Sequence, residues 1–109
     1  MKLKRELSNI QKGYAEVVYT IPESNKEFIG EVMTETFVAY TDFEKDEVHT
    51  VKRWVSYRDL SRGCGKIIVG RLTGYRTRRE ALAALDAYME ALVYGGARFA
   101  EKEQRRITN

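Results

Sequence analysis

The stretch Gly74-Tyr75-Arg76-Thr77-Arg78-Arg79-Glu80-Ala81 decides the fold expected for this 109-residue chain. Its glycine is typical of a turn. Thr77-x-x-Glu80 has the spacing of a capping box, in which the threonine hydroxyl accepts the N–H of residue 80 and the carboxylate reaches back. We therefore predict a helix over residues 77–94, ended by Gly95-Gly96. Its buried stripe is expected to contain Ala81, Leu82, Leu85, Tyr88, Met89 and Leu92.

Three arginines surround the predicted start of this helix: Arg76, Arg78 and Arg79. The N–H groups of a first helical turn already carry positive partial charge, so local electrostatics favour acidic side chains there. Arginines in this place oppose that preference. The pattern therefore indicates a surface for an anion, and a polyphosphate chain is the common anion of this kind.

The region before the helix, residues 13–72, has the pattern of a sheet. Residues 14–21 and 48–59 alternate in the manner of strands, and residues 66–72 form a last short strand. Pro22 and the polar residues after it end the first strand. Phe43-Glu44-Lys45-Asp46-Glu47 is expected to be a hairpin turn, and a second turn is expected over residues 61–65.

Residues 27–42 allow two interpretations. Their apolar residues recur with helical spacing, and Ser24-x-x-Glu27 resembles a capping box. Against this stand Gly30 and the β-rich run over residues 34–41. We expect a long or bulged strand over residues 27–42 with Gly30 at its irregularity, and a helix over residues 25–33 followed by a strand is the alternative.

Both ends of the chain are assigned more loosely. Residues 1–12 are expected to be a basic arm or a short helix, and residues 97–109 a tail or a short helix. The whole chain, residues 1–109, is most simply a single α+β domain. Its expected architecture is an antiparallel meander of three or four strands with one C-terminal helix packed on a face.

The composition indicates an intracellular, cytoplasmic protein that is not an enzyme. No apolar run approaches the ~20 residues that span a bilayer, and the basic N-terminus lacks the apolar stretch of a secretory signal. The single cysteine, Cys64, has no internal partner for a disulfide. The single histidine, His49, has no cysteine near it, and no spacing matches a zinc site or a phosphate loop. We expect no catalytic set, no metal and no cofactor.

Charge divides the chain into two opposed blocks. Residues 13–51 carry nine acidic residues and two lysines, a net charge of −7, whereas residues 52–79 carry nine basic residues and one acid, a net charge of +8. The basic block falls on two predicted strands, the turn between them and the start of the helix. A basic patch of this kind fits phosphate contacts. The alternative is that the charges of the two blocks only offset each other within the folded protein, without a ligand.

Residues 50–94 resemble the arm-type DNA-binding domains of phage and transposon integrases. The resemblance rests on Trp54-Val55-Ser56-Tyr57-Arg58-Asp59, on Gly65-Lys66, and on Gly74 to Ala81 followed by Ala84-Leu85. The Thr-x-x-Glu-Ala helix start is also similar to that of the plant ethylene-response type of DNA-binding domain. The integrase domains are three-stranded sheets backed by a C-terminal helix, and a sheet face enters the DNA major groove. The acidic residues 13–51 have no counterpart in them, and these 109 residues contain no core-binding or catalytic domain, so the expectation is a stand-alone relative.

What the resemblance implies is a small nucleic-acid-binding protein, with DNA favoured, that acts as an accessory or regulatory factor of a phage or mobile element. One strand face would contact DNA, and the arginines at the helix start would clamp phosphates. A slip of one residue in register would instead present Arg53, Val55 and Tyr57. The expected contact residues are Lys52, Trp54, Ser56, Arg58, Lys66, Arg71, Arg76, Arg78 and Arg79.

The alternative expectation is a protein-binding module, such as a phage-type inhibitor or adaptor of a host protein. In that case the acidic block would present carboxylates to a basic partner. A homodimer, through an exposed edge strand or the helix face near Tyr94 and Phe99, fits either function. The acidic residues of this alternative site are Glu23, Glu27, Glu31, Glu35, Asp42, Glu44, Asp46 and Glu47.

Overall fold

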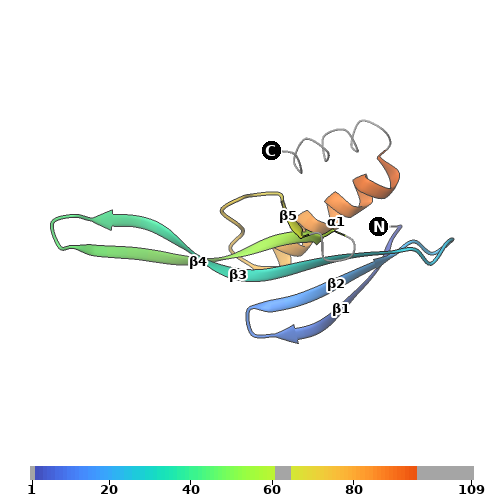
Figure 1. The fold of residues 1–109 in the computed structure, drawn as a ribbon, viewed down its shortest axis with the longest axis horizontal. Coiled ribbons are helices and arrows are strands. Elements are labelled where there is room, and N and C mark those ends of the chain that lie inside the picture. The colour runs from blue at the N-terminus through green and yellow to red at the C-terminus, as the bar shows by residue number, and fades with distance from the viewer. Residues whose placement is uncertain (1, 61–64, 96–109) are drawn as a thin grey trace.

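The computed structural model describes residues 2–60 and 65–95, which form a five-stranded antiparallel sheet with one helix packed on a face (Figure 1). This confirms the predicted α+β meander, with one strand more than expected. The strands lie in the sheet in the order of the sequence. The elements are β1 (Lys4–Gln11), β2 (Tyr14–Thr20), β3 (Glu27–Asp42), β4 (Glu47–Asp59), β5 (Lys66–Val69) and α1 (Arg78–Tyr94). Gly96, the segment 97–109 and residues 61–64 of the predicted second turn lie outside the described residues.

The additional strand is β1, where the sequence predicted a basic arm or a short helix. β1 pairs with β2, with Leu7 opposite Val17 and Arg5 opposite Tyr19. Leu3 and Leu7 would share a face in a helix and in a strand alike, so their spacing does not distinguish the two. Pairing decides between the two, since it provides a row of backbone hydrogen bonds, whereas a short isolated helix is marginal. Leu3, just before β1, is buried in the core.

β3 is a strand throughout, so the alternative of a helix over residues 25–33 is wrong. The expected bulge at Gly30 is also wrong, because Gly30 pairs in regular register with Val17 on one side and Arg58 on the other. The register shift of β3 lies further along, between Val38 and Tyr40. The Ser24-x-x-Glu27 pattern spans the end of the β2–β3 loop and the first residue of β3, and the N–H of Lys26 donates to Ser24 Oγ at 3.4 Å.

The core lies between α1 and one face of the sheet. Leu85 and Met89 of α1 are fully buried, and they meet alternate residues of the central strands. The expected helix stripe is confirmed apart from Leu92, which is only partly buried against the core. The principal sheet residues on this covered face are Ala15, Val17, Tyr19, Val32 and Val69.

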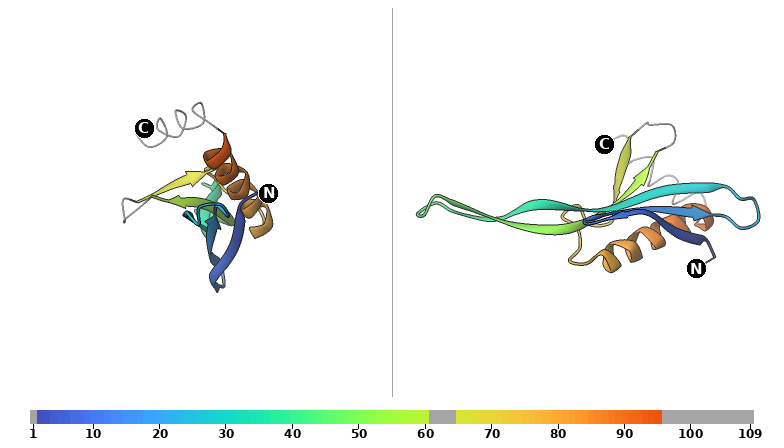
Figure 2. Two further views of the ribbon diagram at one scale, coloured as in Figure 1. Left: turned by 90° about the vertical axis from the view of Figure 1, so that its right-hand side faces the viewer. Right: turned by 90° about the horizontal axis from the view of Figure 1, so that it is seen from below.

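The β3–β4 hairpin extends well beyond the rest of the sheet as a two-stranded arm (Figures 1 and 2). β2 pairs with β3 only as far as Met33. On the other side of β4, the last pairing toward the arm is the bridge between Trp54 and Tyr75. Residues 35–53, here called the arm, therefore have no third strand within the described part of the chain. The longest dimension of the molecule is 59 Å. The arm exposes the large apolar side chains of Val38, Tyr40, Phe43 and Val48.

α1 begins as predicted, with Thr77 as its N-cap. The Glu80 N–H donates to Thr77 Oγ1 at 3.2 Å, and the Thr77 hydroxyl donates in turn to the Glu80 carboxylate. Gly95 follows the helix, and its N–H donates to the Ala91 carbonyl at 2.6 Å. Within residues 2–60 and 65–95, no helix is long and apolar enough to cross a membrane.

Candidate nucleic-acid interface

A tight turn fastens the start of α1 to β4. The backbones of Trp54 and Tyr75 exchange two hydrogen bonds of 2.7 Å, which makes Tyr75 a one-residue extension of the sheet beyond β5. Gly74 precedes this bridge at φ +76°, and a Cβ on it would lie 2.7 Å from the Trp54 carbonyl oxygen. Only glycine fits both the left-handed backbone and the close approach. The arginines that follow are thus held beside β4 at the base of the arm.

Five exposed cations gather around this helix start, and we call them the basic surface: Lys52, Arg71, Arg76, Arg78 and Arg79. Lys52 lies two residues before Trp54, and Arg76 directly follows Tyr75. The Arg71 guanidinium lies over the Tyr75 ring, 5.3 Å from its centroid, and the Arg71 backbone N–H donates to the Tyr75 hydroxyl at 3.1 Å. No carboxylate among the described residues forms an ion pair with any of the five.

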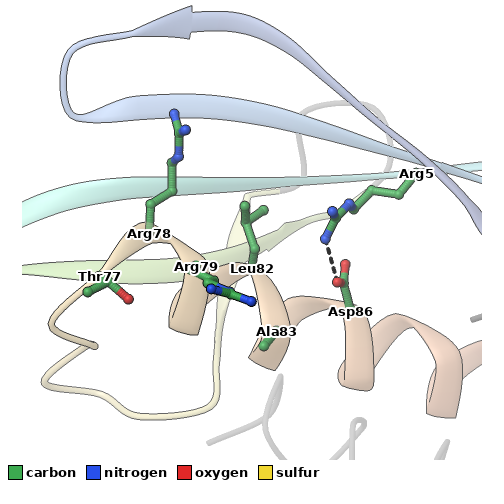
Figure 3. Close-up of a pocket in the computed structure, with 7 residues that line it drawn as sticks. All are labelled: Arg5, Thr77, Arg78, Arg79, Leu82, Ala83 and Asp86. Atoms are coloured by element: carbon green, nitrogen blue, oxygen red, sulfur yellow. Dashed lines mark hydrogen bonds and ion pairs between the residues drawn. The ribbon is translucent and has the colours of Figure 1, made fainter.

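A shallow, open groove of about 550 Å³ adjoins the basic surface, between α1 and β1 (Figure 3). Arg78 and Arg79 line it at the helix start. At its other end Arg5 Nη1 and Asp86 Oδ2 lie 2.5 Å apart, and Tyr19 donates a hydrogen bond of 2.6 Å to the same carboxylate. The Asp86 charge is therefore satisfied by Arg5 and Tyr19. The remaining groove residues are Thr77, Leu82 and Ala83.

Three of the expected DNA-contact residues face α1 rather than open solvent. Ser56 is fully buried, and its hydroxyl donates a hydrogen bond of 2.6 Å to the Ala81 carbonyl. Trp54 packs against the core, and Arg58 donates to the Tyr88 hydroxyl at 3.3 Å. The face of β4 expected to meet DNA is thus covered from Trp54 to Arg58, whereas Lys52 stays exposed. Ser56 in particular has no surface for a ligand.

The face of the sheet that α1 does not cover, here called the open face, presents the residues of the alternative register that a one-residue slip would give. Arg53, Val55 and Tyr57 point to this side, where Val55 is nevertheless buried, and Lys66 of β5 lies on it as well. Lys66 contacts Glu31 at 2.8 Å and is therefore partnered. The carboxylates of this face outnumber its cations near the sheet centre: Glu16, Glu31, Glu35 and Asp59.

These carboxylates shift the ionisation of the groups around them. Burial and Glu31 raise the pKa of Tyr14 to about 12, and burial and Glu35 do the same for Tyr57, which donates a hydrogen bond to Glu35. Burial, with Glu31 close by, raises the pKa of Asp59. The hydrogen bond to Glu31 raises the pKa of Lys66. The open face is therefore a network of neutral hydroxyls and closely spaced carboxylates, unfavourable for a phosphate chain.

The structure separates the residues of the alternative acidic site into three places. Glu23 and Glu27 lie at the β2–β3 loop, and Glu31 and Glu35 belong to the open face of the sheet. The remaining four gather at the tip of the arm, where Asp42 Oδ1 accepts the N–H groups of Glu44 and Lys45. The tip residues are Asp42, Glu44, Asp46 and Glu47.

The part of the chain that the structure describes contains no candidate metal site. Among those residues no group of three or more potential ligands is placed to hold a metal ion. His49 lies in the arm, where its ring stacks on Tyr40 at 4.2 Å between centroids and its Nε2 is 3.2 Å from Glu47. Cys64 is outside the described residues.

Sequence reasoning missed Arg5 and Tyr75 as parts of this site. Arg5 was assigned to a loose arm, and only the pairing of β1 with β2 brings it opposite Tyr19 and across from α1. The position of Tyr75 directly after a turn glycine, Gly74, was a sequence signal, but its bridge to Trp54 depends on a turn geometry that residue spacing does not reveal.

Comparison with protein-family models, with curated proteins and with solved structures found no match to this chain.

Proposed function

We propose that this protein binds duplex DNA through the basic surface, as a non-enzymatic accessory or regulatory factor. One observation supports this most strongly: five exposed cations surround the start of α1, and none pairs with a described carboxylate. If these cations served only to offset the acidic block within the fold, they would form such pairs with its carboxylates. A phosphate backbone supplies closely spaced negative charges that the fold does not.

The expected mode of binding is contact with the phosphate backbone, with little sequence preference. Arginines at a helix start reach phosphates readily, because the backbone N–H groups there favour the same anion. Base reading would need side chains that enter a groove, and Ser56 is buried while Trp54 packs against the core. The acidic open face of the sheet would repel DNA, so in this proposal the duplex lies on the side of the helix start. An intracellular setting is part of this proposal.

The test is the affinity of the full chain for a fluorescent duplex, followed by anisotropy at increasing salt. The wild-type protein should bind at low salt and weaken steeply as salt rises. Reversing Arg76, Arg78 and Arg79 to glutamate should abolish the binding. Changing the same three residues to glutamine should lower the slope of log affinity against log salt by roughly three, since each phosphate contact contributes about one.

The matched control reverses three exposed lysines at the far end of the sheet: Lys2, Lys4 and Lys26. It changes the net charge by the same amount, so it should weaken binding only slightly through the overall field. Equal losses in both triple variants would contradict a localised site. Failure of the wild-type chain to bind any duplex at low salt would overturn the proposal, and preference for duplex RNA would correct its ligand.

A second candidate function is capture of a basic partner protein at the tip of the arm. The observation behind it is Phe43, whose side chain is 89 % exposed in a turn flanked by Asp42 and Glu44. An exposed aromatic ringed by charges is typical of a protein-binding anchor. The test is retention of a partner from nuclease-treated lysate. Phe43→Ser should lose a partner held by the tip, whereas the triple arginine reversal should keep it.

A further inference from the structure

The outer edge of β4 within the arm is an unpaired strand edge. Trp54 directs both its N–H and its C=O to Tyr75, away from β3. Every second residue of an antiparallel strand directs its backbone N–H and C=O to the same side, so Val48, Thr50 and Lys52 point theirs outward as Trp54 does. Between Glu47 and Arg53 no strand of the described residues pairs with this edge. The turn at the tip bounds the edge at one end, and Tyr75 bounds it at the other.

The sequence of this edge is complementary to itself. Residues 47–53 read Glu-Val-His-Thr-Val-Lys-Arg, with an acid at one end, two bases at the other and Thr50 at the middle. Antiparallel pairing of two copies about Thr50 places Glu47 of each opposite Arg53 of the other. The same register pairs Val48 with Lys52, so every outward backbone group faces another one in hydrogen-bonding position.

We propose that two copies of this chain associate through these edges, joining two arms into a four-stranded antiparallel ribbon with a two-fold axis at Thr50. A two-stranded ribbon is marginal by itself, and pairing doubles its strands. Opposite charges meet at both ends of the shared edge. Val48, 60 % exposed in one copy, is covered by the aliphatic part of the second copy's Lys52. The surface is isologous, which closes the assembly at two copies.

The opposite edge of the arm does not offer this complementarity. On β3 the Thr34 N–H points outward to Gly13, so the alternate Thr36 also directs its N–H away from β4. Residues 34–42 contain Glu35 and Asp42 and no basic residue. No antiparallel register of two such edges brings opposite charges together. The two edges therefore give a matched pair of sites for a test.

The first experiment measures the mass of the full chain by sedimentation equilibrium across a broad concentration range, without nucleic acid. Wild type should reach twice the monomer mass. Thr50→Pro removes an outward N–H of the β4 edge without breaking the β3–β4 ladder, and it should remain a monomer. Thr36→Pro makes the same change on the β3 edge and should still dimerise. A monomeric wild type, or a dimer abolished by Thr36→Pro and kept by Thr50→Pro, would overturn the proposal.

A charge exchange tests the register. Arg53→Glu and Glu47→Arg should each dimerise at least tenfold more weakly than wild type, because like charges then meet at both ends of the edge. An equal mixture of the two variants should recover dimers, because one copy then carries acids at positions 47 and 53 and the other carries bases at both. Mixing that restores no association would contradict this pairing.

Cross-linking tests the axis independently of affinity. Directly opposed residues in a hydrogen-bonded pair have Cα atoms about 5.5 Å apart, within the range of a disulfide. In a Cys64→Ser background, Thr50→Cys should form a covalent dimer on oxidation, and Thr36→Cys should not. Equal cross-linking at both positions would reject the β4 edge as the interface. None of these measurements depends on DNA, so they stand or fall separately from the proposed function.

Discussion

Leu85 lies directly against the backbone of Gly30: a Cβ at residue 30 would be 2.8 Å from Leu85 Cδ2 and 2.8 Å from the Tyr57 carbonyl oxygen. This contact explains a glycine in the middle of a long, regular strand. The missing side chain lets α1 approach the sheet closely enough for Leu85 to be fully buried. The glycine is a feature of helix packing, where the sequence alone favoured a bulge.

Gly30→Ala is therefore expected to destabilise the protein although alanine suits a strand better. The new methyl group would overlap Leu85 and the Tyr57 backbone, and relief would require the helix to shift. We expect a loss of about 1–3 kcal/mol in the free energy of unfolding, the usual cost of overpacking a core. Urea denaturation measures it, and an unchanged or raised midpoint would contradict the packing of α1 over residue 30.

Ser56→Ala separates a core role from a contact role. The hydroxyl is buried and holds the first turn of α1 through Ala81, so its removal should cost about 1–2 kcal/mol. The affinity for duplex DNA at a temperature where the variant is folded should stay within about twofold, that is, about 0.4 kcal/mol. Ser24→Ala, in an exposed loop, is the control and should change neither quantity measurably.

Lys66→Met should expose the dependence of buried Glu31 on its ion pair. Glu31 is 5 % exposed, and no other described cation lies within ion-pair distance of it. Because the Lys66 side chain is 42 % exposed, solvent screens the pair, and we expect a loss of about 1–2 kcal/mol rather than the roughly 3–5 kcal/mol of a fully buried pair. Adding Glu31→Gln should recover most of the loss.

A second ion pair offers the control for this experiment. Lys4 and Glu6 lie 3.3 Å apart with side chains 69 % and 67 % exposed. Lys4→Met should therefore change the free energy of unfolding by less than about 0.5 kcal/mol. Equal effects of Lys4→Met and Lys66→Met would mean that Glu31 does not rely on Lys66.

Local signals in the sequence were sufficient for the helix and for most of the sheet. The Thr77 cap and the apolar stripe depend on spacing within a few residues, so both could be predicted. Strand β1 could not, because its apolar spacing fits a helix and a strand equally and pairing with β2 decides. The length of the arm is likewise a tertiary property, fixed by where β2 and Tyr75 stop pairing.

The candidate site was predictable at the helix start and not on β4. The arginines follow a recognisable turn and cap, and the structure leaves them exposed. For β4, the choice of covered face depends on which side α1 occupies, and both faces carry a mixture of apolar and basic residues. The alternation of residues 51–58 therefore gave two equivalent registers, and Ser56 was assigned to the wrong environment.

Asp59→Asn should stabilise the protein at neutral pH. Burial raises the Asp59 pKa, Glu31 of β3 and Glu16 of β2 add to the rise, and Lys66 of β5 opposes it. The folded state then binds the proton more tightly than the unfolded chain, whose aspartate has a pKa near 3.9. Stability from this group is consequently present below that value and is lost as pH rises through the folded pKa.

The neutral amide lacks this penalty, so the melting temperature of Asp59→Asn should exceed that of wild type at pH 7, and the difference should shrink as the pH falls and vanish near pH 3. The Lys66–Glu31 pair stays intact in this variant because Lys66 bonds to Glu31. Asp46→Asn, at an exposed turn position, removes the same charge and should show no such pH-dependent gain. Thermal melts of the three proteins from pH 3 to 8 decide the matter: a gain that persists at pH 3 would show that the amide packs better for reasons other than charge.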